Sequence, residues 1–349
     1  MTSRRLLAIA FVALLVACNP STATTTTGGA TSTSSTSSEP VPARDLAYGY
    51  EAGQSLRYDV MVTQDITFTA TGDAPGFGDA SLPIDADLVT ESQGHTTYAI
   101  EEGQSPDTFT IDIAARFPET RVAGSVNGDT VNSLEEGGVE ADLARIEPVD
   151  VTIAVNEVGR ILEDEFDDAT VLGADLAALT GLTNDLFAVP VGPLFERGSV
   201  VTIGDRWETE SSLDGKNGPV EARSESEITD IVDGVFVIET TTVTDTYQVD
   251  FSEEFRNLYL EFAELESDGE IPPEVRDGLD AIEFVITVDE SSTVEVAHFD
   301  PSDGLVRSST KTSATRLTMT FRAPDDSEET SGFEITLDLT QMAVFTLDR

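Results

Sequence analysis

The sequence has very little of the residue types on which most enzymes and metal proteins depend. Its 349 residues include one cysteine and two histidines, His95 and His298. A single cysteine cannot form an internal disulfide, and two histidines offer few metal ligands. Neither a Gly-x-Ser-x-Gly turn nor a His-Glu-x-x-His helix is present. We therefore expect no enzyme activity, no catalytic or metal-ligating residue and no cofactor.

Basic residues are also scarce, with 19 Lys and Arg against 66 Asp and Glu and a net charge of −47. A chain this acidic is repelled by nucleic acid, which we exclude as a partner. We interpret the charge as an adaptation for solubility, with binding of divalent cations or basic partners as the alternative. The densest acidic cluster, Glu163–Asp168, lacks the residue order of a calcium loop and is interpreted as a solvated turn ahead of a helix.

Long apolar runs are missing as well. The longest, Leu6–Ala17, has 12 residues and would rise about 18 Å as a helix, short of the roughly 30 Å hydrocarbon core. It follows the positive Arg4 and Arg5 and ends in small residues, which is the pattern of a secretory signal peptide. We predict that residues 1–17 are removed, which leaves 17 basic and 66 acidic residues and a net charge of −49.

The residues at the predicted cut, Leu15-Val-Ala-Cys18, resemble the lipobox of bacterial lipoproteins. In that family the cysteine thiol receives diacylglycerol and carries fatty acyl chains such as palmitate. The resemblance implies lipidation of Cys18 and a lipid anchor that holds the chain on the extracytoplasmic side of the cell membrane. An ordinary signal peptide with a chance cysteine is the alternative. The expected partner is the membrane, through this anchor; a protein partner is not predicted.

Residues 18–44 have the composition of a tether. Ser and Thr make up 14 of the 20 residues from Ser21 to Pro40, and no apolar side chain there is larger than Ala. Such a segment cannot bury a core, so we expect it to be disordered between the lipid and the folded part.

Alternation of apolar and polar residues dominates the rest of the chain. This period of two is typical of antiparallel strands with one covered and one wet face. His298 has the parity of Val294 and Val296, so we expect it on the covered side in a structural role. The alternating runs are Leu56–Val62, Phe109–Ile113, Val149–Val155, Ile282–Val288, Val294–Val296, Leu317–Phe321 and Phe333–Leu339.

Three further segments have apolar residues at helical spacing. They are Thr170–Asp185, Ser252–Leu265 and Pro273–Leu279, and we expect them to cover the sheet. The predicted fold class is therefore α+β and β-rich, with long curved antiparallel sheets backed by a few helices.

A weak internal repeat suggests how these elements are arranged. Gly53-Gln-Ser-Leu-Arg-Tyr58 matches Gly204-Asp-Arg-Trp-Glu-Thr209 at an offset of 151, and the hairpin glycines Gly159 and Gly304 differ by 145. We predict two duplicated half-barrel-like units, 45–195 and 196–349. The alternatives are chance similarity between hairpins and a single domain over 45–349.

The Gly-Asp-x-Trp strand start and the Asp-Pro-x-x-Gly-Leu-Val hairpin, behind a lipobox and a Ser/Thr tether, resemble actinobacterial lipoproteins. The resemblance covers most of 45–349 in pattern. It includes uncharacterised domain families and, more distantly, LolA-like and mycobacterial lipid-carrier lipoproteins. In the carriers a half-barrel sheet and its helices enclose acyl chains, but no binding residue can be matched one by one.

The resemblance implies a membrane-anchored extracytoplasmic lipoprotein that binds a lipid or another apolar ligand, with ligand residues unknown. The alternative is a structural or protein-interaction component of the cell surface without a ligand cavity. A large apolar cavity between sheet and helices distinguishes the first from the second.

Overall fold

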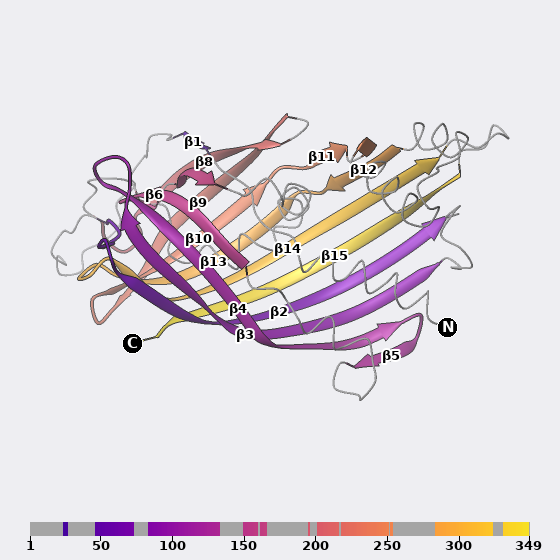
Figure 1. Cartoon of the computed structure of the whole chain (residues 1–349), viewed down its shortest axis with the longest axis horizontal. Coiled ribbons are helices and arrows are strands. Elements are labelled where there is room, and N and C mark those ends of the chain that lie inside the picture. The colour runs from indigo at the N-terminus through magenta and orange to yellow at the C-terminus, as the bar shows by residue number, and fades with distance from the viewer. Residues whose placement is uncertain are drawn as a thin grey trace, which may run out of the picture.

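The structure is a computed structural model, and nearly all of the residues that it describes are in β-strands (Figure 1). Every strand pairing is antiparallel, and all strands belong to one sheet. The described residues are 24–26, 46–72, 83–132, 149–159, 161–165, 195, 201–215, 218–250, 252–253, 283–323 and 331–348.

The sheet has fifteen strands. The first seven are β1 (Thr24–Thr26), β2 (Ser55–Gly72), β3 (Ile84–Glu102), β4 (Thr108–Val126), β5 (Asp129–Asn132), β6 (Val149–Asn156) and β7 (Ile161–Glu165). The others are β8 (Arg206–Gly215), β9 (Gly218–Val232), β10 (Val235–Thr244), β11 (Tyr247–Asp250), β12 (Glu283–Val288), β13 (Ser291–Asp300), β14 (Leu305–Ala323) and β15 (Ser331–Leu347). Their order is β1-β8-β9-β10-β13-β14-β15-β2-β3-β4-β6-β7, while β5 pairs with β4, and β12 pairs with β11 and β14.

The predicted α+β class is wrong. Where the structure describes the chain, helical geometry is confined to Ser252 and Glu253, and the strands form one continuous sheet instead of two separate half-barrel-like units. The predicted helices 170–185 and 273–279 lie outside the described residues, as does Ser252–Leu265 apart from its first two residues. The fold class differs because the strands are long. Strands β2, β3, β4, β14 and β15 have 17 to 19 residues each, against 3–10 in most globular proteins.

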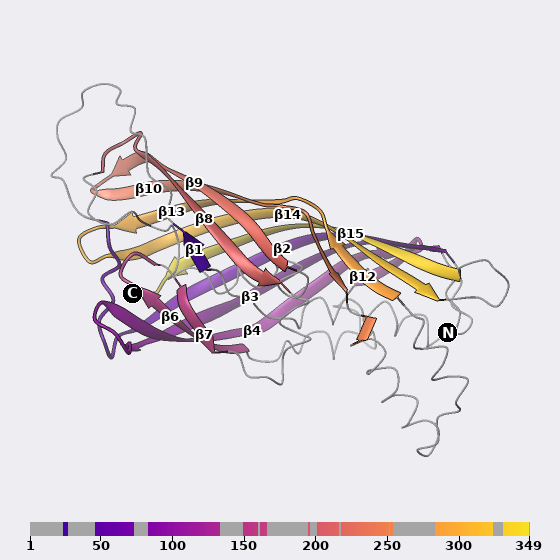
Figure 2. The same ribbon diagram turned by 90° about the horizontal axis from the view of Figure 1, so that it is seen from above.

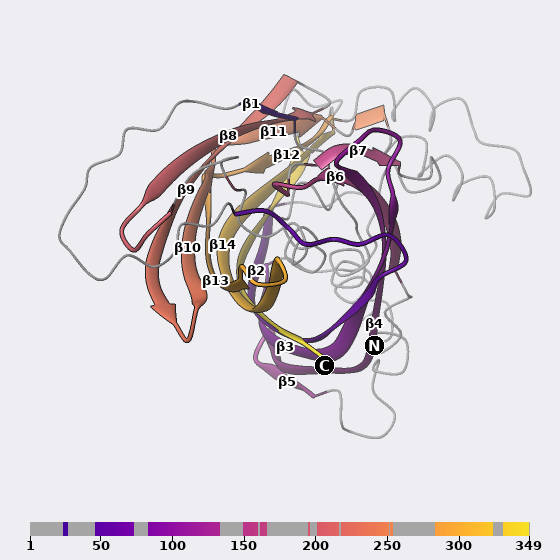
Figure 3. The same cartoon turned by 90° about the vertical axis from the view of Figure 1, so that its left-hand side faces the viewer.

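These long strands curve together. Seen from above, the sheet sweeps along the whole molecule (Figure 2), and seen from its end it bends so that β8–β10 and β3–β4 lie on opposite sides of the curve (Figure 3). Bulges contribute to the bend, because an extra residue kinks one strand of a pair. The register shifts between Gln93 and His95 on β3, between Val237 and Ile238 on β10, and between His298 and Phe299 on β13.

Most of the predicted strand faces are confirmed. Alternate residues of β2 from Leu56 to Val62 are buried, and so are Leu317, Met319 and Phe321 on β14. The prediction for β13 is wrong. Val294 is 39% exposed, because Phe299 is fully buried and places the odd-numbered residues inward, which leaves His298 on the other face.

The two repeated glycines begin strands in the same way. Gly53 precedes β2 with φ of 83°, and Gly204 precedes β8 with φ of 88°. Gly53 N donates to Ile100 O, and Gly204 N donates to Ile228 O, each at 2.8 Å. The strand orders β2-β3-β4-β6-β7 and β8-β9-β10-β13-β14 also correspond, with β15 added between them. In both parts of the sheet the main strands therefore follow one another in chain order.

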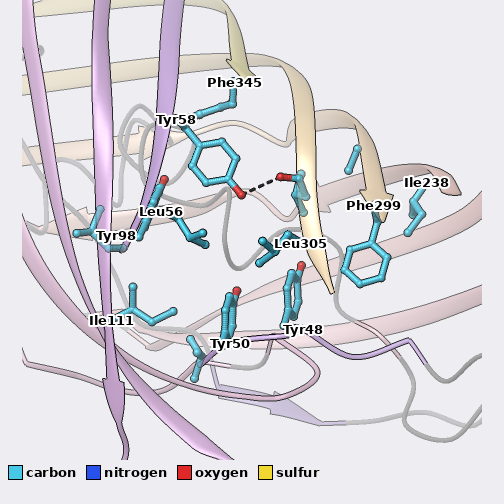
Figure 4. Close-up of a cluster of buried hydrophobic side chains, with 14 of the residues drawn as sticks. Tyr48, Tyr50, Leu56, Tyr58, Tyr98, Ile111, Ile238, Phe299, Leu305 and Phe345 are labelled. Atoms are coloured by element: carbon cyan, nitrogen blue, oxygen red, sulfur yellow. Dashed lines mark hydrogen bonds between the residues drawn. The ribbon is translucent and has the colours of Figure 1, made fainter. Parts of the chain in front are cut away.

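The segment Leu46–Tyr50 connects these two parts at one end of the sheet. Tyr48 N donates to Glu157 O at 2.7 Å in the first part, and Gly49 N donates to Gly304 O at 2.9 Å in the second. The Tyr48 ring stacks on Tyr50 with a centroid distance of 5.0 Å and meets Phe299 edge-on at 5.7 Å. The segment thus joins the turn between β6 and β7 to the turn between β13 and β14. Tyr48 and Tyr50 pack among the buried hydrophobic side chains (Figure 4).

We predict that Gly304→Ala destabilises this end of the sheet. Gly304 has φ of 70°, and a Cβ there would lie 2.1 Å from Gly49 N, so Leu46–Tyr50 would have to move away. Gly234→Ala is the matched control, because Gly234 has φ of 86° but open space around its Cβ position. We expect the free energy of unfolding to fall by about 1–2 kcal/mol in the control and by clearly more in Gly304→Ala. Urea unfolding of both variants measures the difference, and equal losses would contradict the close packing.

Candidate functional site

The inward, concave face of the sheet carries two apolar clusters. Cluster A lies near Leu46–Tyr50 and is shown in Figure 4. Cluster B lies toward the other ends of the long strands. Among the members of cluster A are Tyr48, Tyr50, Leu56, Tyr58, Tyr98, Ile111, Trp207, Ile238, Phe299 and Phe345. Cluster B comprises Ile66, Ala70, Ile84, Ala86, Leu88, Val122, Ile286, Val288, Leu317, Met319, Ile335, Leu337 and Leu339.

Two adjacent rows of residues cross the sheet between these clusters, and we call them the polar band. The register joins each row strand by strand, and fourteen of its eighteen residues are polar. Row 1 is Trp207, Ser226, Thr240, Glu295, Lys311, Ala343, Val62, Ser92 and Thr120. Row 2 is Thr209, Ser224, Thr242, Thr293, Ser313, Gln341, Gln64, Thr90 and Val122.

A chain of side-chain hydrogen bonds runs along row 2 over β3, β2 and β15. Thr90 Oγ1 donates to Gln64 Oε1 at 2.8 Å, and Gln64 Nε2 donates to Gln341 Oε1 at 3.0 Å. The chain stops at Gln341, which is 1% exposed and whose Nε2 has no hydrogen-bond partner. A buried donor without a partner costs about 1–3 kcal/mol, so this amide is the least satisfied polar group of row 2.

An ion pair lies at the centre of row 1. Lys311 Nζ is 3.6 Å from Glu295 Oε2, and both side chains are less than 10% exposed. Glu295 Oε1 also accepts a hydrogen bond of 2.7 Å from Ser309 Oγ. Among the buried residues that the structure describes, Glu295 and Lys311 are the charged ones. Desolvation of two charges is expensive, so a pair retained here contributes little net stability, although loss of one partner is costly.

Hydroxyl pairs extend the band to both sides. Ser226 and Thr240 share a hydrogen bond of 2.9 Å on β9 and β10, and Ser92 and Thr120 share one of 3.1 Å on β3 and β4. Trp207, the single tryptophan of the chain, lies opposite Ser226 at the β8 end of row 1. Its indole therefore has a position from which its fluorescence can report changes in the band.

Several shifted pKa values occur at the end of the sheet near Leu46–Tyr50 and the turn between β13 and β14. Burial raises the pKa of the Tyr48 and Tyr50 hydroxyls well above the usual range, so both rings stay neutral. Partial burial acts to raise the pKa of Asp300, but hydrogen bonds from Ser302 and Arg307 outweigh it and lower that pKa to about 2. Asp300 thus stays charged and ties Arg307 to the turn between β13 and β14.

The residues that the sequence analysis named as candidates are not part of the polar band. Cys18 is outside the described residues. Of the acidic cluster Glu163–Asp168, the first three residues belong to β7 and not to the predicted turn, and the other three lie outside the described residues. His298 Nδ1 lies 3.0 Å from Ser308 Oγ, a cross-strand neighbour. Within the described chain, no group of three or more acidic, histidine or cysteine side chains is arranged to hold a metal ion.

Sequence reasoning missed the polar band. A pattern was available, because Gln64 has the parity of the apolar Leu56–Val62 run, and Gln341 has the parity of Phe333–Leu339. In the sequence, Gln64 and Gln341 each follow an apolar run as a single polar residue, so neither by itself indicates a polar row. Their meeting depends on the register between β15 and β2, which are far apart in the sequence.

The chain has weak structural similarity to known proteins. No protein-family model matches the chain, and no curated protein matches it. Among solved structures, the chain is similar to an outer membrane channel from Pseudomonas putida F1, with 7% identity, 89% of this chain and 100% of that chain covered, and a TM-score of 0.21. It is also similar to the outer membrane protein OprD from Pseudomonas aeruginosa, with 6% identity, 88% and 95% coverage, and a TM-score of 0.20. At such scores the likeness assigns no function.

The expected role as a lipoprotein that encloses a lipid or another apolar ligand is corrected, and so is its alternative, a structural or protein-interaction component. The predicted helix-covered apolar cavity is not part of the described fold, whose inward face is crossed by polar side chains. Within the described residues, no helix is long and apolar enough to span a membrane.

We predict that breaking the buried ion pair costs more stability than removing it. Lys311→Met leaves the Glu295 carboxylate buried and unpaired, so we expect a loss of about 3–5 kcal/mol in the free energy of unfolding. The double variant Glu295→Leu/Lys311→Met should recover most of that loss. Arg316→Met, which breaks an exposed pair with Asp338, should change little.

Guanidinium unfolding of the four proteins, wild type included, measures these values. A double variant as unstable as Lys311→Met would contradict the assignment of the cost to the unpaired carboxylate.

Proposed function

We propose that the chain is an exported binding protein whose polar band holds a polar, hydrogen-bonding ligand. The observation that carries the proposal is Gln341, a fully buried amide at the end of a hydrogen-bonded row with an unused Nε2 donor. Apolar cores seldom retain such a group, because it costs stability without a partner. A ligand with an acceptor atom at this position satisfies the amide.

The arrangement of the band supports binding more than catalysis. Its side chains are amides, hydroxyls and one ion pair, held by cross-strand hydrogen bonds on long paired strands. Rigid strands present such groups at fixed spacing, which favours recognition of a polar molecule. Clusters A and B on either side supply the apolar contact that most ligand sites combine with a few polar groups.

A channel function, which is that of the similar Pseudomonas putida protein, has an observation against it. The outward face of β2 and β3 carries exposed carboxylates, including Asp59, Asp65, Asp85, Asp87 and Glu91. Charged side chains are costly in contact with hydrocarbon, and membrane strands place apolar residues on their lipid face. The outward face of this sheet instead has the composition of a wet surface.

We propose in addition that the protein is held at the extracytoplasmic side of a membrane by lipid on Cys18. The support is the order of charged, apolar and small residues up to Leu15-Val-Ala-Cys18. The Ser/Thr-rich residues that follow then separate the sheet from the bilayer.

The anchor is tested with Cys18→Ser. We expect this variant to incorporate no alkyne-labelled fatty acid and to leave the washed membrane fraction, because its only thiol is gone. Thr22→Ala is the control and should remain labelled and membrane-bound. Unchanged labelling of Cys18→Ser would exclude the proposed anchor.

The binding function is tested on the purified protein with four classes of polar molecule: neutral oligosaccharides, amino acids, short peptides and nucleosides. Trp207 fluorescence and the unfolding temperature are the readouts. We expect one class to raise the unfolding temperature, and Gln341→Met to weaken its binding at least about tenfold, the effect of losing one hydrogen bond to a buried group.

Gln93→Met is the matched control, because Gln93 is exposed on the outward face of β3. Three outcomes would overturn the proposal: no class binds, palmitate binds in preference to all four, or both glutamine variants weaken binding equally.

A further inference from the structure

We propose that strand β1 holds the protein against the bilayer with the open side of its curved sheet, the side on which both sheet edges lie, toward the lipid. This inference rests on the proposed lipid anchor at Cys18. Three observations lead to it: the pairing of β1 with β8, the few residues between β1 and Cys18, and the position of the sheet edges.

Strand β1 lies in residues 18–44, where the sequence predicts a tether. Its three residues pair with β8 in antiparallel register, with Thr24 opposite Ser212 and Thr26 opposite Glu210. Without β1, strand β8 would be the edge of the sheet, and the unpaired N–H and C=O groups of an edge accept a further strand. The tether supplies that strand, so the sheet is attached to it at β8.

This attachment shortens the reach of the anchor. Thr24 follows Cys18 by six residues, whereas Leu46, at the start of the segment that joins the two parts of the sheet, follows it by 28. Six residues span at most about 22 Å when fully extended, against about 95 Å for 28. With lipid on Cys18, the part of β8 that pairs with β1 therefore lies within about 22 Å of the bilayer surface.

Both edges of the curved sheet lie on one side of the molecule. Strands β8 and β7 are at opposite ends of the strand order, apart from the short β1. In Figures 1 and 3, β1, β8 and β6 lie along the upper side, while β3 lies along the lower side. A bilayer within reach of β8 therefore faces the open side between these edges, and β3 is directed away from it.

The distribution of charge agrees with this orientation. The exposed carboxylates Asp85, Asp87 and Glu91 lie on the outward face of β3, on the side away from the edges. Anionic lipid headgroups repel carboxylates, and the repulsion falls off over about 10 Å at 0.1 M salt. Near the β8 edge, Arg206 and Arg223 each form an ion pair with a glutamate on the neighbouring strand. These arginines reduce the repulsion between this edge and an anionic bilayer.

The pairing is tested by disulfide formation in the purified full chain with Cys18→Ser, which removes the only native thiol. Thr26→Cys is combined with Glu210→Cys, the position opposite, or with Glu208→Cys, two residues along the same exposed face of β8. We expect the first pair to oxidise at least about tenfold faster, because opposite Cβ atoms lie about 4.5–5.5 Å apart and diagonal ones about 7–8 Å. Equal rates, or a disulfide between two molecules, would overturn the pairing within one chain.

The orientation is tested with the lipidated chain in phosphatidylcholine vesicles that contain an acceptor-labelled lipid. A donor dye is attached to Glu208→Cys on β8 or to Glu91→Cys on β3, both at exposed positions. Lipid occupies the Cys18 thiol, so each variant has one free thiol. We expect energy transfer to be at least about twofold more efficient from the dye on β8, because about 22 Å of chain limits the distance of this strand from the bilayer.

The role of β1 is tested with Thr25→Pro/Thr26→Pro in both dye-labelled variants. Proline has no N–H, and one of two successive residues in an antiparallel strand bonds to its partner, so this change removes the pairing with β8. We expect the difference in energy transfer between β8 and β3 to be lost. Thr33→Pro/Ser34→Pro is the matched control, with the same two prolines outside β1, and should retain the difference.

The outcomes distinguish this inference from the anchor on which it rests. Equal energy transfer from both dye positions would overturn the orientation, even where the disulfide forms. Equal effects of the two proline variants would overturn the role of β1. Absence of fatty acid on Cys18 would overturn the anchor together with the orientation, and the disulfide rates would still decide the pairing of β1 with β8.

Discussion

The pairing between β15 and β2 is the constraint on which the rest of this structure depends. It joins the last strand of the chain to the first long one through fifteen residue pairs, from Phe333 opposite Gly72 to Leu347 opposite Tyr58. A shift of one residue in this ladder would turn every side chain of one part of the sheet to the opposite face. Both apolar clusters and both polar rows cross this junction, so they exist only in this register.

The same constraint explains why polar residues are tolerated inside the core. Gln64 and Gln341 lie opposite each other on β2 and β15 and each offers the other a hydrogen-bonding partner. Glu295 and Lys311 do the same on β13 and β14. A polar group is cheaper to bury when a neighbour on the next strand is polar too, which is why most of these residues lie beside a polar residue, although Ala343 and Val62 interrupt row 1.

The end of the sheet near Leu46–Tyr50 follows a different principle. There the glycines Gly49 and Gly304 let two backbones approach, and aromatic rings fill the remaining volume. Tyr58 crosses from β2 to donate to the Val306 carbonyl at 2.8 Å, so even this aromatic cluster contains a polar connection between distant parts of the chain (Figure 4). The segment Leu46–Tyr50 is thus hydrogen-bonded to both parts of the sheet.

Local features were predictable from the sequence because they depend on neighbouring residues. Alternation identified the faces of β2, β14 and β15, and Gly53 and Gly204 marked equivalent strand starts. The prediction of the inward face of β13 failed because contacts with residues distant in the sequence decide which side chains are buried. Val294 is more apolar than Glu295, yet Glu295 faces inward because Lys311 lies opposite it and Phe299 sets the parity of β13.

The sequence by itself determined the alternating strands, the strong negative charge and the order of residues that leads to Cys18, since each is a property of composition or spacing. The tertiary structure alone decided that these strands form one sheet and that Gln64, Gln341, Glu295 and Lys311 share one face in two adjacent rows. Strand order and register arise from contacts between residues up to nearly 300 positions apart, and no local pattern contains them.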